Sequence, residues 1–188
     1  MNLLDTLVPT YVQMLGALSA WLGKAGVQMT GGEADALLST RLAADMFPLS
    51  TQVRFACVQA QEGVFRLQGR AFPEMIEHLL KEGRNAGDQP GCIADAQARI
   101  EETIAAVKVA ATQAPCAEPG ASLPHALPNG MIFELTAEGY ARDWALPQFY
   151  FHVMIAYAIL RSQGVDLGKE DYVAHMFPYL RPGTLPQR

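Results

Sequence analysis

Three long segments of the chain carry apolar residues at helical spacing. In residues 4–28 the apolar positions alternate steps of three and four: Leu4, Leu7, Tyr11, Met14, Leu18, Trp21 and Ala25. Similar stripes run through residues 48–69 and 93–112. This spacing places the apolar side chains on one face of a helix, as in a helix that packs against a core. We therefore predict a core-facing helix in each of the three segments.

A fourth segment, residues 147–163, is apolar almost throughout. Between Phe149 and Leu160 only His152 interrupts the apolar run. A helix that is apolar on all sides is usually buried, and this one is shorter than the roughly 20 residues of a membrane span. Pro147 suits the first turn of a helix, where its missing N–H costs nothing. We predict a central core helix that carries one histidine.

The segment 48–69 also contains small residues within its stripe. Ala56, Ala60 and Gly63 would let a neighbouring helix approach closely. Cys57 falls at the edge of the stripe and is predicted to be a small buried hydrophobe rather than a nucleophile, since no neighbour would lower the pKa of its thiol.

The connections between these segments differ in length and composition. Residues 114–130 form a linker rich in Pro and Gly, residues 131–136 have β character, and residues 140–146 are predicted to return as a second strand. Such a ribbon is marginal alone and must lie on the helices. Short helices are expected near 33–38 and 72–81. The sequence thus predicts a mainly α, single-domain four-helix bundle over residues 1–188, with a small β-ribbon before the last long helix.

Composition narrows the class of protein further. Half of the 188 residues are hydrophobic, which is ample for one core, and the 14 basic residues form no cluster in a chain of net charge −5. We therefore expect neither nucleic acid nor a membrane as a partner. The N-terminus lacks the basic region and cleavage site of a signal peptide. Three cysteines without C-x-x-C spacing are typical of reduced thiols in a cytoplasmic protein.

Several stretches together resemble one protein family. They are RLAADMFPLSTQV at 41–53, ALPQFYFHVMIAYAILR at 145–161 and GVDLGKEDY at 164–172. In residue identity, order and spacing they are similar to the signatures of the bacterial DUF1993 family, which is grouped with the DinB/YfiT-like four-helix bundles. The resemblance covers nearly the whole chain. It implies an up-down-down-up bundle and a homodimer, but no established activity.

The same resemblance raises the question of a metal site. In the wider superfamily three histidines hold a divalent metal that activates water or a thiol, and two of them form an H-x-x-x-H pair on the fourth helix. Here His152 stands at the first place of that pair and Ala156 at the second, and the second helix has no histidine. A catalytic zinc usually takes three protein ligands. We therefore predict no metal cofactor, with zinc or nickel as the alternative.

His152 has three possible roles. It is predicted to be a core histidine hydrogen-bonded to a side chain or carbonyl. The alternatives are a metal ligand, with Asp45 as its best partner, and a general acid or base. Arg41 and Asp45 are four residues apart and would pair if that stretch were helical, or would lie at the mouth of a ligand pocket.

Tyr157 and Arg161 share one face of the last long helix, turned away from that of His152. Such a face is usually core or interface, and the alternative is a ligand pocket closed by stacking of Arg161 on Tyr157. The ligand-pocket candidates are thus His152, Asp45, Arg41, Tyr157 and Arg161. We predict a small-ligand-binding or non-catalytic bundle that lacks the superfamily's full histidine triad. The alternative is a metal-dependent hydrolase or thiol transferase with a divergent site around His152 and Asp45.

Overall fold

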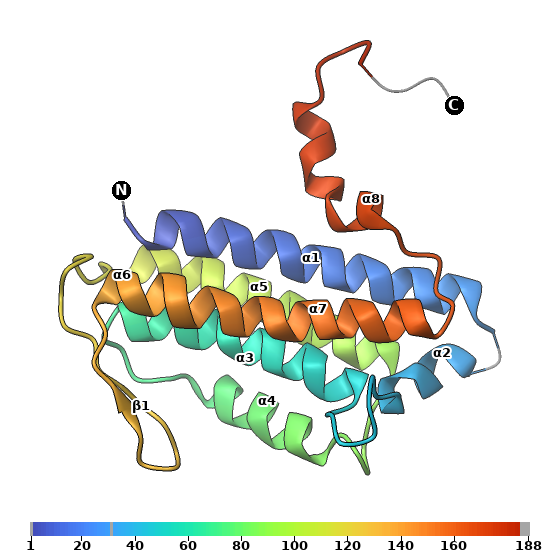
Figure 1. The fold of residues 1–188 in the computed structure, drawn as a ribbon, viewed down its shortest axis with the longest axis horizontal. Coiled ribbons are helices and arrows are strands. Elements are labelled where there is room, and N and C mark those ends of the chain that lie inside the picture. The colour runs from blue at the N-terminus through green and yellow to red at the C-terminus, as the bar shows by residue number, and fades with distance from the viewer. Residues whose placement is uncertain (1, 31, 185–188) are drawn as a thin grey trace.

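Four long helices form the body of the protein. The computed structural model describes residues 2–30 and 32–184. The helices are α1 (Leu4–Gln28), α3 (Leu49–Leu67), α5 (Ile93–Gln113) and α7 (Leu146–Ser162). They lie side by side, with α1 and α7 running in one direction and α3 and α5 in the other (Figure 1). The predicted up-down-down-up bundle is confirmed, and the helix boundaries agree closely with those that the apolar pattern indicates.

Local signals explain where these helices begin and end. Pro48 has extended backbone and immediately precedes α3, while Gly69, with φ +62°, turns the chain away after that helix. At the start of α5 the backbone N–H of Asp95 donates to Cys92 Sγ, and the N–H of Cys92 donates to Asp95 Oδ2 at 3.1 Å. This reciprocal capping satisfies two amides that the helix itself leaves unpaired.

Helix α3 is the central element. It packs against α1, α5 and α7, and its remaining side is covered by α4 (Glu74–Asn85). The hydroxyl of Thr51 donates to the carbonyl of Gly83 on α4 at 2.7 Å, and Arg54 Nε lies 3.4 Å from Glu82 Oε2. Short α2 (Glu33–Ala36) and the 3₁₀ turn η1 (Leu37–Ser39) connect α1 to the loop before α3. The short helices predicted near 33–38 and 72–81 are therefore present.

The ribbon exists, and one of its strands lies in the predicted segment 131–136, but the other is not the predicted one. β1 (His125–Ala126) pairs antiparallel with β2 (Ile132–Phe133), and His125 lies opposite Phe133. β1 thus falls within the segment expected to be a linker. The turn closes with Leu127 N–H donating to Met131 O at 2.8 Å and with Gly130 at φ +89°. Two-residue strands beside prolines carry almost no periodic signal, which is why the pattern misses the first of them.

Residues 140–146, predicted as a strand, are helical instead. α6 (Ala137–Gly139) begins at Thr136, whose hydroxyl accepts from Gly139 N–H at 3.1 Å, and continues as the π-helix η2 (Tyr140–Ala145) into α7. Buried Tyr140 and Ala145 are five residues apart, which suits the wider turn of a π-helix. Pro147 lies in the first turn of α7, as predicted, although the π-helix precedes it without a break.

Helix α7 is not buried on all sides, contrary to the prediction from its apolar run. Phe151 is 54% exposed and Met154 38% exposed, and together they form an outward stripe on α7. Beyond α7, helix α8 (Lys169–Tyr172) is held to α1 by a 2.6 Å ion pair between Lys24 and Asp171. Among the described residues, no helix is long and apolar enough to cross a membrane.

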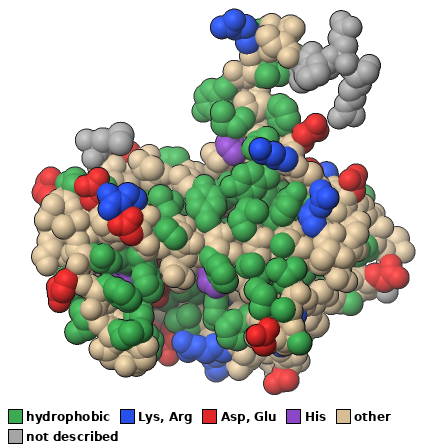
Figure 2. Space-filling view, in the orientation of Figure 1, with side chains coloured by type: hydrophobic (Ala, Val, Ile, Leu, Met, Phe, Trp, Pro, Cys, Tyr) green, Lys and Arg blue, Asp and Glu red, His purple; other side chains and the backbone are tan. Residues whose placement is uncertain are grey.

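The chain then leaves the bundle. The 3₁₀ segment η3 (Ala174–Tyr179) and the residues after it project away from the four helices; we call residues 174–184 the C-terminal arm (Figure 1). The arm exposes four large hydrophobic side chains: Met176, Phe177, Tyr179 and Leu180. Hydrophobic side chains also gather around the foot of the arm (Figure 2).

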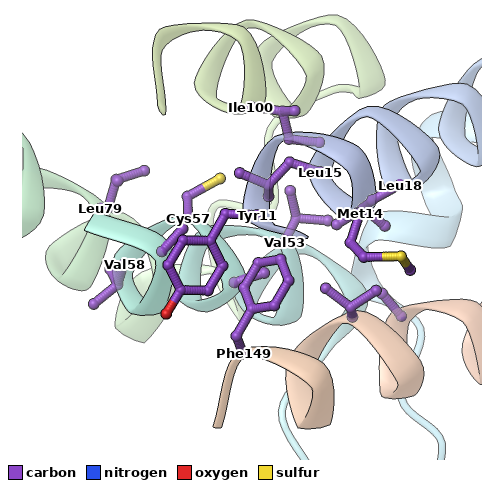
Figure 3. Packing of buried hydrophobic residues seen from close by; sticks show 14 of the residues in the cluster. Tyr11, Met14, Leu15, Leu18, Val53, Cys57, Val58, Leu79, Ile100 and Phe149 are labelled. Carbon is purple, nitrogen blue, oxygen red and sulfur yellow. The ribbon is translucent and has the colours of Figure 1, made fainter. Parts of the chain in front are cut away.

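The core is built around Tyr11. Its ring is fully buried and meets the ring of Phe149 from α7 edge to face, with centroids 4.7 Å apart (Figure 3). Cys57 lies in the same cluster, fully buried as predicted, and burial raises the pKa of its thiol to about 12. A Cβ on Gly63 would overlap the Tyr11 hydroxyl, so only glycine lets α1 and α3 approach this closely. The expected close packing along α3 is confirmed.

Replacing Gly63 tests this close approach. Gly63→Ala should lower the free energy of unfolding by about 1–3 kcal/mol, because the new methyl group overlaps the Tyr11 side chain in a packed core. Gly16→Ala is the matched control: this glycine also lies inside a helix, and nothing stands within 4 Å of its Cβ position. Urea unfolding would measure both variants. Equal stability of Gly63→Ala and Gly16→Ala would contradict the proposed packing.

Candidate functional site

His152 faces α3, where it pairs with a glutamine. Its Nδ1 lies 2.9 Å from Gln52 Oε1, and Gln52 Nε2 donates to the carbonyl of Phe47 at 3.1 Å. Gln52 is buried, whereas His152 is partly buried. The pair therefore joins α7, the first turn of α3 and the loop that leads into α3.

This chain of hydrogen bonds fixes the state of the imidazole. Because the Gln52 amide nitrogen donates to Phe47, its oxygen is the atom that faces His152 and accepts the Nδ1 proton. Nε2 then carries a lone pair. Among the described residues no hydrogen bond to Nε2 is found, and this nitrogen is not one of the fully buried atoms without a partner. The lone pair of Nε2 is therefore left for another partner.

Aromatic rings surround the imidazole. The ring centroids of Phe55 and Phe151 lie 5.5 Å and 5.3 Å from that of His152, both edge to face, and Phe47 packs on Phe55 at 5.6 Å. Burial in this setting disfavours the charged form and lowers the pKa of His152 to about 4. At neutral pH the side chain is an uncharged hydrogen-bond acceptor with apolar surroundings.

Arg41 and Asp45 lie apart from this pair. Residues 40–48 form an irregular exposed loop, so the helical spacing assumed for an Arg41–Asp45 pair does not occur. Arg41 donates to the carbonyl of Met46. In the described part of the chain no ion pair or hydrogen bond joins Asp45 to Arg41 or to His152. The loop contributes its apolar residue, Phe47, to the surroundings of His152.

Tyr157 and Arg161 connect α7 to other parts of the structure. Tyr157 meets Trp21 of α1 edge to face at 5.2 Å, and Arg161 donates to the carbonyl of Leu167 in the turn after α7. Trp21 in turn stacks on Tyr172 of α8 at 6.3 Å. No stacking of Arg161 on Tyr157 occurs among the described residues. The two side chains tie α7 to α1 and to the C-terminal turn, on a different face from Gln52.

The residues around His152 do not fit the superfamily's metal. Ala156, one turn beyond His152, is fully buried and offers no donor atom. Gln52 uses its oxygen for His152 and its nitrogen for Phe47. Over residues 2–30 and 32–184, no group of three or more His, Cys, Asp or Glu side chains is placed to hold a metal ion. His152 alone supplies one ligand where a catalytic zinc takes three.

The sequence pattern did not identify the partners of His152. The partner it offered was Asp45, and it singled out none of Gln52, Phe47 and Phe55. Gln52 and Phe55 are three residues apart on α3 and so share a face, which is a weak signal that two residues act together. The missing information is which face of α7 meets that face, and only the packed bundle supplies it.

Fold and site together define a DinB-like four-helix bundle with a histidine–glutamine pair between α7 and α3. Residues 3–173 match the family model "Domain of unknown function (DUF1993)", and the chain belongs to that family. A crystal structure of a DinB family member protein from Shewanella denitrificans is similar at 31% identity and a TM-score of 0.60, covering 99% of this chain and 100% of that one. No curated protein matches the sequence. The resemblance inferred from the three motifs is confirmed.

The low pKa of His152 predicts a specific loss of stability in acid. An unfolded histidine titrates near pH 6.5, whereas the folded His152 titrates near pH 4. Between these values the unfolded chain binds more protons, so stability falls as pH is lowered through this window. His152→Gln removes this contribution, so we expect the wild type to lose about 2–3 kcal/mol more than the variant between about pH 7 and pH 4.

Urea unfolding at a series of pH values would measure this difference. His125 and the carboxyl groups titrate in both proteins, and their contributions cancel in the comparison. Parallel stability curves for the wild type and His152→Gln would show that His152 is not held in its neutral form.

Proposed function

We propose that the protein is a non-catalytic bundle that binds a small molecule at His152. The observation that carries this proposal is the hydrogen-bonded chain from Phe47 through Gln52 to His152. It orients a neutral imidazole with its Nε2 lone pair outward, next to the rings of Phe55 and Phe151. Such a group accepts a hydrogen bond from a ligand hydroxyl or N–H while the rings contact the ligand's apolar part.

We further propose that this site works without a metal cofactor. A hydrolase or thiol transferase built on a metal would need ligands converging on His152, and no such group of side chains is found among the described residues. A histidine with a pKa near 4 is also a weak general base at neutral pH, where efficient catalysis calls for a pKa close to the working pH. Recognition therefore fits this residue better than catalysis does.

A pair of matched probes tests the proposal. Phenol can donate its O–H to His152 Nε2, whereas anisole has the same ring and no donor. In ¹⁵N NMR of the imidazoles we expect phenol to shift the Nε2 signal of His152 and anisole to leave it unchanged. His152→Ala should abolish binding of phenol and, by orphaning Gln52 Oε1 and leaving a cavity, should cost about 1–3 kcal/mol of stability.

Metal titration supplies the result that would contradict the proposal. Zinc or nickel should raise the melting temperature of the wild type no more than that of His152→Ala. A clear stabilisation confined to the wild type would show a metal site on His152. Equal responses of the His152 signal to phenol and anisole would reject hydrogen bonding at Nε2.

We also propose that the protein acts as a homodimer in the cytoplasm. The outward stripe of α7 and the C-terminal arm both expose large hydrophobic side chains on one molecule, and the arm extends beyond its own bundle (Figures 1 and 2). A second copy can cover the exposed arm through a two-fold axis and leave the His152 site open. The three free cysteines suit a reducing compartment.

Loss of the arm's apolar side chains should separate the dimer. Met176→Ser/Phe177→Ser removes two side chains that are 52% and 47% exposed and that should be buried only in the dimer. Light scattering at micromolar concentration should give a dimer for the wild type and a monomer for this variant. Met131→Ser/Ile132→Ser, on the equally exposed turn and strand of the ribbon, is the control that should remain dimeric. A monomeric wild type would rule out this assembly.

A further inference from the structure

Two arginines near the end of α3 have no carboxylate partner. Arg66 lies in the last turn of α3, Arg70 follows just beyond the helix, and none of the ion pairs among the described residues includes either. Arg66 places its guanidinium over the ring of Phe72, 5.1 Å from the centroid, and Arg70 lies over Phe65 at 4.7 Å. Arg70 also donates from Nη1 to Gln68 Oε1 and from Nη2 to Gln113 Oε1, both at 3.2 Å, so its charge faces neutral amide oxygens and no carboxylate. Stacking on a ring holds each guanidinium plane in place.

Both arginines line the same cavity. It has a volume of about 400 Å³, and its other lining residues are Gly69, Ala71, Phe72, Leu123 and Pro124. Two connections form its walls: the segment after α3 and the segment that enters β1, at the end of the bundle where the ribbon lies (Figure 1). The lining contains two positive charges, apolar side chains and no acidic residue.

Among the described residues, no carboxylate forms an ion pair that would neutralise these two positive charges. Arg66 Nε is buried and has no hydrogen-bond partner, and an unsatisfied guanidinium N–H is costly. Glu62, one turn earlier on α3, lies within electrostatic range of Arg66 but outside ion-pair distance, and burial raises the pKa of its carboxyl. Behind the cavity, His125 is 4% exposed with neither ring nitrogen bonded, and burial and the charge of Arg66 lower its pKa.

We propose that this cavity binds the carboxylate of a small organic acid. The guanidinium groups of Arg66 and Arg70 hold the two carboxylate oxygens, since a planar fork of N–H donors matches that geometry. Leu123, Pro124 and Phe72 contact the apolar body of the acid. A cavity of this size accommodates a ring with a short side chain.

This site is separate from the one at His152. Arg66 stands about 20 Å further along α3 than Gln52, at a rise of about 1.5 Å per residue. The two sites also differ in chemistry, because one presents a neutral acceptor and the other presents charged donors. A ligand test at one of them therefore leaves the other unaffected, and either proposal can fail alone.

Benzoate and its neutral analogue benzamide are the probes. At about 10 mM, benzoate should raise the melting temperature of the wild type by about 3 °C, as expected for a ligand with millimolar affinity for the folded state. Benzamide should leave it unchanged. Arg66→Gln and Arg70→Gln should each abolish the benzoate effect. Arg84→Gln, on the exposed side of α4, removes the same charge far from the cavity and should keep it.

Circular dichroism would establish that each variant is folded. If Arg66→Gln is not folded, the test relies on Arg70→Gln alone. A benzoate effect that persists in Arg70→Gln, or an equal effect of benzamide, would overturn the proposal. An equal effect of inorganic phosphate would also overturn it, because the cavity would then bind any anion without recognising the apolar part of the acid.

Discussion

The contact between Tyr11 and Gly63 sets the geometry on which the other helices depend. The ring of Tyr11 fills the space that any larger residue at position 63 would need, and this fixes how closely α1 approaches α3. Phe149 of α7 packs on the same ring, so three of the four helices meet at one aromatic group. The buried hydroxyl has no hydrogen-bond partner, and that cost is offset by full burial of the ring.

Around this point, α3 directs polar side chains as well as apolar ones into the bundle. Gln52 reaches α7, Thr51 and Arg54 reach α4, and Gln61 donates to Thr103 of α5 at 3.3 Å. Each of these side chains is buried and needs a partner at a defined position. Hydrophobic burial brings the helices together, while these hydrogen bonds select their rotation and register. The His152–Gln52 pair is one member of this set.

The two proposed binding sites lie near opposite ends of α3, one against α7 and the other against the segment that enters β1. Near the start of α3 a neutral imidazole stands among aromatic rings; near its end two arginines stack on aromatic rings beside an apolar cavity. At the first site the polar groups stand on rigid helices, and at the second Arg66 stands on α3 while stacking on Phe65 holds Arg70 in the segment after the helix. This arrangement keeps the donors and acceptors oriented before a ligand arrives, which reduces the entropy lost on binding.

The sequence by itself determined the four long helices, the single histidine of α7, the close packing along α3 and the family. These features are local or periodic: stripes at helical spacing, prolines and glycines at helix ends, and small residues within one stripe. Only the tertiary structure decided the partner of His152, the first strand of the ribbon and the exposed stripe on α7. A periodic pattern shows which face of a helix is apolar, but not which neighbour that face meets or whether a second chain covers it. Those outcomes depend on how all the helices fit together, because each contact is formed by residues far apart in sequence.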